Sequence, residues 1–172
     1  MEKEPHIKLR AAATNSGGLC GSSYLNRIFE AYLDRKLTGY KGSWNEDCLR
    51  EAAKAFETEI KPLFNGDDLQ NLRIRIHGLK ASSDHGIVNN FLTFTAQELR
   101  EEVFDQVITK VQGLVRHQIA RTSGEVKKIL LVGGFGRNPY LKKRLEEVGR
   151  VETIGERRVF DCFSFLRLAV TD

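Results

Sequence analysis

The sequence lacks the features that mark membrane proteins and secreted proteins. None of its apolar runs approaches the ~20 residues that a membrane-spanning helix needs, and residues 2–5 are charged or proline where a secretory leader would be apolar. Cysteine is also scarce. Cys20, Cys48 and Cys162 are odd in number and too widely separated for a disulfide framework or a zinc site. We therefore expect reduced thiols, a cytoplasmic location and no membrane partner.

Clustered charge and clustered histidine are missing as well. The 172 residues carry 27 basic and 23 acidic side chains, and the two signs alternate along most of the chain. Only residues 142–144 and 157–158 form short basic clusters, so we expect no nucleic-acid partner. The four histidines occur singly, without the spacing of a metal site, and we expect none of them to be a metal ligand.

Hydrophobic periodicity in the first half of the chain predicts short strands and amphipathic helices. Apolar residues recur at helical spacing in two segments, and Ser43 and Glu46 form a capping-box pattern before the second. Strict alternation of apolar and polar residues follows, which is typical of a half-buried strand. The predicted elements are a strand at 7–13, helices at 21–36 and about 43–63, and strands at 72–76 and 91–94 around a hairpin-like loop at 81–86.

The second half begins with the strongest helical pattern of the sequence. Thr95 and Glu98 form a second capping box, and nine apolar residues then follow at helical spacing as far as Ile119. A continuous apolar run comes next, as in a strand that is buried on both faces. Pro139 suits the first turn of a further helix. The predicted elements are a helix from 95 to about 119, a strand at 128–132, a glycine turn at 133–136 and a helix at about 138–148.

The glycine turn is the first candidate binding site. Nucleotides usually bind at the carboxyl ends of strands in α/β sheets, where glycines let a ligand approach the backbone and a helix amino terminus favours anionic groups. The turn lacks the third glycine of a dinucleotide fingerprint and the Lys-Ser/Thr pair of a Walker loop. Taken alone, it is equally well explained as a structural tight turn.

Residues 130–141, Leu-Leu-Val-Gly-Gly-Phe-Gly-Arg-Asn-Pro-Tyr-Leu, closely resemble the adenosine-binding motif of the 70-kDa heat-shock protein family. In that family the paired glycines pass beside the ribose and the arginine lies against the adenine. The resemblance thus implies these roles for Gly133, Gly134 and Arg137, with Gly136 in the same turn. A guanidinium plane stacks well on a base, which makes the assignment physically reasonable.

A second segment, residues 17–27, looks like the double-glycine turn and helix that follow the family's second phosphate hairpin. Its insertion, residues 19–22, resembles the divergent, chaperone-related branch of the family. The resemblance implies that Gly17, Gly18 and Gly21 lie on the phosphate side of the site. A simple helix-capping turn remains the alternative.

Glu57 and Lys61 form the third candidate. Family members place a glutamate and a basic residue four positions apart on a helix of the small lobe, where both reach over the adenosine. Glu57 and Lys61 match this spacing and share one helix face. Ile60 occupies a neighbouring position that is basic in the family, so an ordinary surface ion pair remains an equal alternative.

The resemblance implies an α/β fold of the actin-like ATPase (ribonuclease H-like) type, of which this chain would be the second lobe. The family's two phosphate hairpins, with its catalytic lysine and Mg²⁺ ligands, have no counterpart in these residues. We expect ATP or ADP binding, with no catalytic or metal-binding residue here and no hydrolysis by this chain alone. The expected parts are a large-lobe subdomain at 8–36 and 95–150, a small-lobe insertion at 37–94 and a divergent tail at 151–172.

An alternative of a different class is an interaction module that is derived from the same fold, binds no nucleotide and contacts protein partners or co-chaperones. Arg137 separates the two hypotheses, because a scaffold has no need of an arginine at the adenine position. A sugar or acetate kinase of the same superfamily would need a substrate motif, and none is recognisable.

Overall fold

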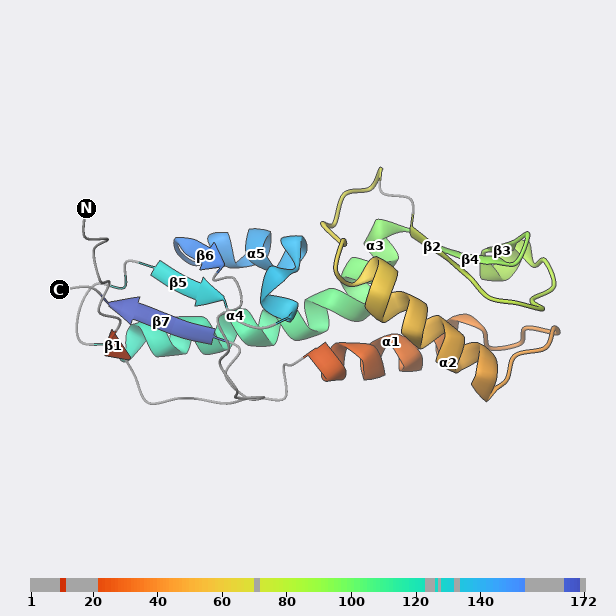
Figure 1. Cartoon of the computed structure of the whole chain (residues 1–172), viewed down its shortest axis with the longest axis horizontal. Helices are drawn as coiled ribbons and strands as arrows, with labels where there is room; N and C mark the ends of the chain where they lie inside the picture. The colour runs from red at the N-terminus through yellow and green to blue at the C-terminus, as the bar shows by residue number, and fades with distance from the viewer. Residues whose placement is uncertain are drawn as a thin grey trace, which may run out of the picture.

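The computed structural model describes residues 22–69, 72–122, 126, 128–131 and 134–152, and the backbone alone of residues 10–11, 153 and 166–170. The protein is mixed α/β, with two small sheets. Figure 1 shows the sheets at opposite ends of an elongated molecule, joined by one long helix. The coarse prediction of an α/β protein is confirmed.

The first helical segments lie beside the sheet that is formed within residues 72–94, called the second sheet below (Figure 1). The predicted helix at 21–36 is confirmed, and the next one continues from α-helical into π-helical geometry without a break. A π-helical turn adds one residue per hydrogen-bonded ring and is frequent at functional sites. The elements are α1 (Ser22–Lys36), α2 (Glu46–Ala55) and the π-helical turn η1 (Phe56–Ile60).

The start of α2 differs from the prediction. Asn45, not Ser43, is the N-cap, and its Oδ1 accepts a 3.0 Å hydrogen bond from the Cys48 backbone N–H. Glu46 is therefore the first helical residue. A capping box needs its glutamate at the third helical position, so Glu46 does not form one. Serine and asparagine cap equally well, so residue type alone could not choose between the two positions.

The second sheet is antiparallel, in the order β2-β4-β3. Both predicted strands are confirmed, with Leu72 opposite Phe94. The loop between them contains a 3-10 turn and a two-residue strand that periodicity did not predict. The elements are β2 (Leu72–Arg75), η2 (Ser83–His85), β3 (Ile87–Val88) and β4 (Phe91–Phe94).

The long helix joins the two ends of the molecule (Figure 1). Its predicted capping box is confirmed. Thr95 Oγ1 accepts from the Glu98 backbone N–H at 3.0 Å, and Glu98 Oε2 accepts from the Thr95 N–H at 2.7 Å. The apolar face is buried along the helix, including Val107 and Val111. The helix comprises α3 (Ala96–Leu99), the π-helical turn η3 (Arg100–Phe104) and α4 (Asp105–Ala120).

The first sheet has the order β1-β7-β5-β6. Its β5 strand pairs in parallel with β6 and antiparallel with β7, and the consecutive side chains of residues 129–131 are buried, as the apolar run predicts. The strands β6 and β7 fall in the last part of the chain, where periodicity predicted none. The elements are β1 (Arg10–Ala11), β5 (Lys128–Leu131), α5 (Pro139–Glu146), β6 (Val151–Thr153) and β7 (Leu166–Val170).

Pro139 occupies the first turn of α5, as predicted. None of the helices in the ranges described above is long and apolar enough to cross a membrane.

Candidate functional site

The two described glycines of the turn after β5, Gly134 and Gly136, have different structural roles. Gly136 is buried, and an added Cβ would lie 3.3 Å from the carbonyl carbon and the Cβ of Leu131. The absence of a side chain therefore lets the turn pack closely on β5. Gly134 is exposed with φ −58°, and an added Cβ would meet no described atom within 4 Å. Neither backbone conformation nor packing against the described residues requires glycine at position 134.

Arg137 ends the 3-10 turn η4 (Phe135–Arg137) that follows Gly134. Its backbone N–H donates to the Gly134 carbonyl at 3.3 Å, which closes the turn. The side chain is exposed, and within the described part of the chain its guanidinium has no hydrogen-bond or ion-pair partner.

Asn138 connects this turn to the end of the helix that contains η1. Its side chain is only 2% exposed. The Nδ2 group donates to the carbonyl oxygens of Lys61 at 2.7 Å and Phe64 at 3.2 Å, while Oδ1 accepts from the Leu141 N–H at 2.7 Å and so caps α5. Sequence reasoning did not select Asn138. The only available signal was its position directly before Pro139, a common N-cap pattern.

Lys61 and Glu57 form the predicted pair on one helix face, with Lys61 Nζ 3.3 Å from Glu57 Oε1. Lys61 is only 6% exposed, and Nζ also donates to Ser22 Oγ and Asn26 Oδ1, both at 2.7 Å. Burial lowers the pKa of Lys61, although Glu57 offsets part of this shift. The charge of Lys61 in turn lowers the pKa of the exposed Glu57. The pair is therefore no ordinary surface ion pair, because its cation is buried.

The structure thus brings three predicted segments together. The helix of Glu57 and Lys61 contacts the amino-terminal end of α1 through the Lys61 ammonium, and it contacts the turn at 134–138 through the Lys61 carbonyl. Other predicted binding residues lie outside the described ranges: Gly17, Gly18, Gly21 and Gly133.

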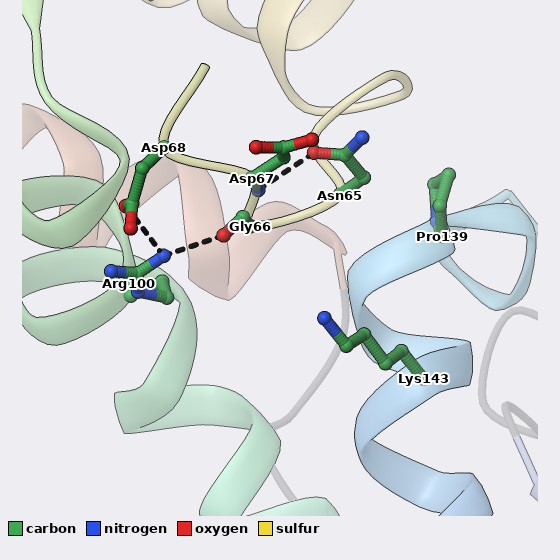
Figure 2. A pocket seen from close by; sticks show the side chains of 7 residues that line it. All are labelled: Asn65, Gly66, Asp67, Asp68, Arg100, Pro139 and Lys143. Carbon is green, nitrogen blue, oxygen red and sulfur yellow. Dashed lines mark hydrogen bonds and ion pairs between the residues drawn. The ribbon is translucent and has the colours of Figure 1, made fainter. Parts of the chain in front are cut away.

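A cleft of about 640 Å³ lies on the molecule where the 65–68 loop faces the start of α5. Figure 2 shows Lys143 of α5 pointing toward this loop. Across the cleft, Arg100 Nη1 donates to the Gly66 carbonyl and lies 2.9 Å from Asp68 Oδ1. Sequence reasoning did not find the cleft, since nothing in the pattern around Arg100 indicated it. The lining residues are Asn65, Gly66, Asp67, Asp68, Arg100, Pro139 and Lys143.

The charges of the cleft largely neutralise one another. Asp68 pairs with Arg100, and Asp67 Oδ1 accepts from the Leu69 N–H at 2.9 Å. Within the described ranges, no group of three or more His, Cys, Asp or Glu residues could hold a metal ion.

Comparison with known proteins yields no relative. A scan of family models, a search of curated proteins and a search of solved structures each found no match.

Proposed function

We propose that this chain binds an adenine nucleotide, ATP or ADP, at the turn of residues 134–137, as a chaperone-related protein of the actin-like ATPase fold. One observation supports the proposal most strongly. In the turn after a buried strand, an exposed Gly134 whose position does not require glycine in the described structure lies three residues before Arg137, whose exposed side chain has no partner among the described residues. A cytoplasmic location belongs to the same proposal, because it follows from the scattered cysteines.

The chemistry of the turn suits the adenosine part of a nucleotide. Without a Cβ, Gly134 leaves its backbone open to the close approach of a ribose. The Arg137 guanidinium can stack on the adenine ring, an interaction that contributes about 1–2 kcal/mol at a partly desolvated site. The carboxyl end of a strand followed by a helix is the usual place for such a ligand in an α/β sheet.

A nuclear magnetic resonance titration tests the proposal. ADP is added to the ¹⁵N-labelled wild type, to Arg137→Ala and to Arg116→Ala. Arg116 is a matched control, because it is exposed on α4 and its side chain has no partner among the described residues. We expect shifts at the amides of Gly134 and Arg137 in the wild type. Arg137→Ala should bind ADP roughly 5- to 30-fold more weakly, whereas the control should bind as the wild type does.

Two outcomes contradict the proposal. If ADP at several millimolar shifts no amide in residues 134–138 of the wild type, the interaction-module hypothesis gains. If ADP binds the wild type and Arg137→Ala equally well, the adenine assignment of Arg137 is wrong.

A further inference from the structure

We infer that Lys61 and Asn138 are positioning residues, which together hold the 134–138 turn and the amino-terminal end of α1 at a fixed separation. The resemblance implies a direct contact between Lys61 and the nucleotide. We infer instead that the Lys61 ammonium holds its own helix to α1 through hydrogen bonds. The effect that we expect on ADP affinity rests on the proposed function. The hydrogen bonds of Lys61 and Asn138 do not depend on that function.

The Lys61 ammonium has three protons, and the structure supplies three acceptors for them. Ser22 Oγ and Asn26 Oδ1 lie at 2.7 Å, and Glu57 Oε1 lies at 3.3 Å. The side chain is 8% exposed, so a ligand could reach Nζ only by displacing one of these groups. A buried charge needs such partners, because burial without them is strongly unfavourable. The Lys61 ammonium therefore has all three of its protons engaged within the protein, two of them by α1.

The side-chain amide of Asn138 is also engaged in hydrogen bonds within the protein. Its Nδ2 group donates to the carbonyl oxygen of Lys61, which caps the end of η1, and to that of Phe64 in the turn that follows, and its Oδ1 caps α5. Carbonyls at a helix carboxyl terminus have no partner within the helix, so a donor from another segment stabilises them. One of the two carbonyls belongs to Lys61, and residue 61 thus contacts α1 through its side chain and the 134–138 turn through its backbone.

Single substitutions can therefore remove the contacts of the Lys61 side chain and those of the Asn138 side chain one set at a time. Lys61→Met keeps the apolar stem and the backbone carbonyl but removes the hydrogen bonds to α1. Asn138→Ser keeps a good N-cap for α5 but is too short to reach both carbonyls. Asn45→Ser is a matched control, because Asn45 caps α2 through a single hydrogen bond to the Cys48 N–H. Thermal unfolding of each variant verifies that it is folded.

The first measurement uses the protein without nucleotide. We expect Asn138→Ser to shift the amide signals of Gly134 and Arg137 and those of Lys61, Leu63 and Phe64. Asn45→Ser should leave all of these signals in place. The positioning role of Asn138 is overturned if its variant leaves the Gly134 and Arg137 signals unchanged.

The second measurement is the affinity for ADP. We expect Asn138→Ser and Lys61→Met each to bind ADP about fivefold more weakly, and Asn45→Ser to bind within about twofold of the wild type. Moved amide signals with unchanged ADP affinity would overturn the role in binding and leave the proposed function intact. Moved signals in a protein whose wild type binds no ADP would overturn the proposed function and still support the positioning of the turn.

Discussion

The ring of Phe64 stacks on the ring of Phe104, with a centroid distance of 4.1 Å and an angle of 18° between the planes. Both side chains are fully buried. Tyr140 of α5 meets the pair edge-on, 5.2 Å from Phe64 and 6.1 Å from Phe104. Phe64 follows η1, Phe104 belongs to η3 and Tyr140 belongs to α5, so the three rings pack these segments together around the candidate site.

Phe104→Ala should lower the free energy of unfolding by about 3–5 kcal/mol, because it removes a buried ring and leaves a cavity under two others. Urea unfolding measures the change. Phe91→Ala, at a half-buried strand position, should cost clearly less. A loss below about 1 kcal/mol for Phe104→Ala would mean that the rings do not pack as described.

Val107→Asp and Val111→Asp should each prevent cooperative folding, because both positions are buried on the long helix and a carboxylate there would be removed from water. The exposed Arg116 on the same helix provides the control Arg116→Asp, which should fold. Circular dichroism and thermal melts report the result. A soluble, cooperatively unfolding Val107→Asp would show that this face is accessible and available for a partner protein.

Glu98 should make the protein more sensitive to acid. Desolvation opposes its charged form, but hydrogen bonds from Lys36 and from the Thr95 backbone outweigh that effect and lower its pKa below the ordinary 4.5. A lowered pKa contributes stability that is present above the ordinary value and is lost as the pH falls through the pKa of the folded state. Glu98→Gln keeps the capping geometry without the charge.

Unfolding free energies between about pH 6 and about pH 3 should therefore converge for the wild type and Glu98→Gln. Because Glu98 is partly exposed, we expect the wild type to be more stable by only about 0.5–1 kcal/mol at the upper end. Parallel curves across this range would contradict the assigned role of Glu98.

The two described glycines of the turn should respond differently to alanine. Gly136→Ala should cost about 1–3 kcal/mol of stability, because its Cβ would press on the Leu131 backbone. Gly134→Ala should be neutral or stabilising by up to about 1 kcal/mol, because its backbone is helical and its surroundings are open. If position 134 is glycine because a ligand approaches its backbone closely, Gly134→Ala should bind ADP more weakly although it is stably folded. Unchanged affinity would remove the functional reason for this glycine.

Local sequence patterns predicted the elements well where one residue type had one structural reason. The Thr95 and Glu98 box and the position of Pro139 depend on residues a few positions apart, and the alternation from Leu72 follows the two-residue period of a strand. The structure confirms each. The helical spacing of Glu57 and Lys61 predicted their ion pair for the same reason.

Contacts between distant segments could not be predicted in this way. Asn138 donates to carbonyls 77 and 74 residues earlier in the chain, and no local pattern encodes such partners. The pairing of β5 with β7 is of the same kind. The burial of Lys61 also depends on α1, so the sequence showed the ion pair but gave no indication that the cation is enclosed.

The most direct test of nucleotide binding at the turn is photolabelling with 8-azido-ADP, followed by mass spectrometry of the labelled peptides. We predict covalent labelling within residues 134–141 that excess ADP abolishes, and that Gly134→Asp, which places a charged side chain in the open space, strongly reduces. Labelling that maps elsewhere, or that persists in excess ADP, would contradict the central claim that this turn binds an adenine nucleotide.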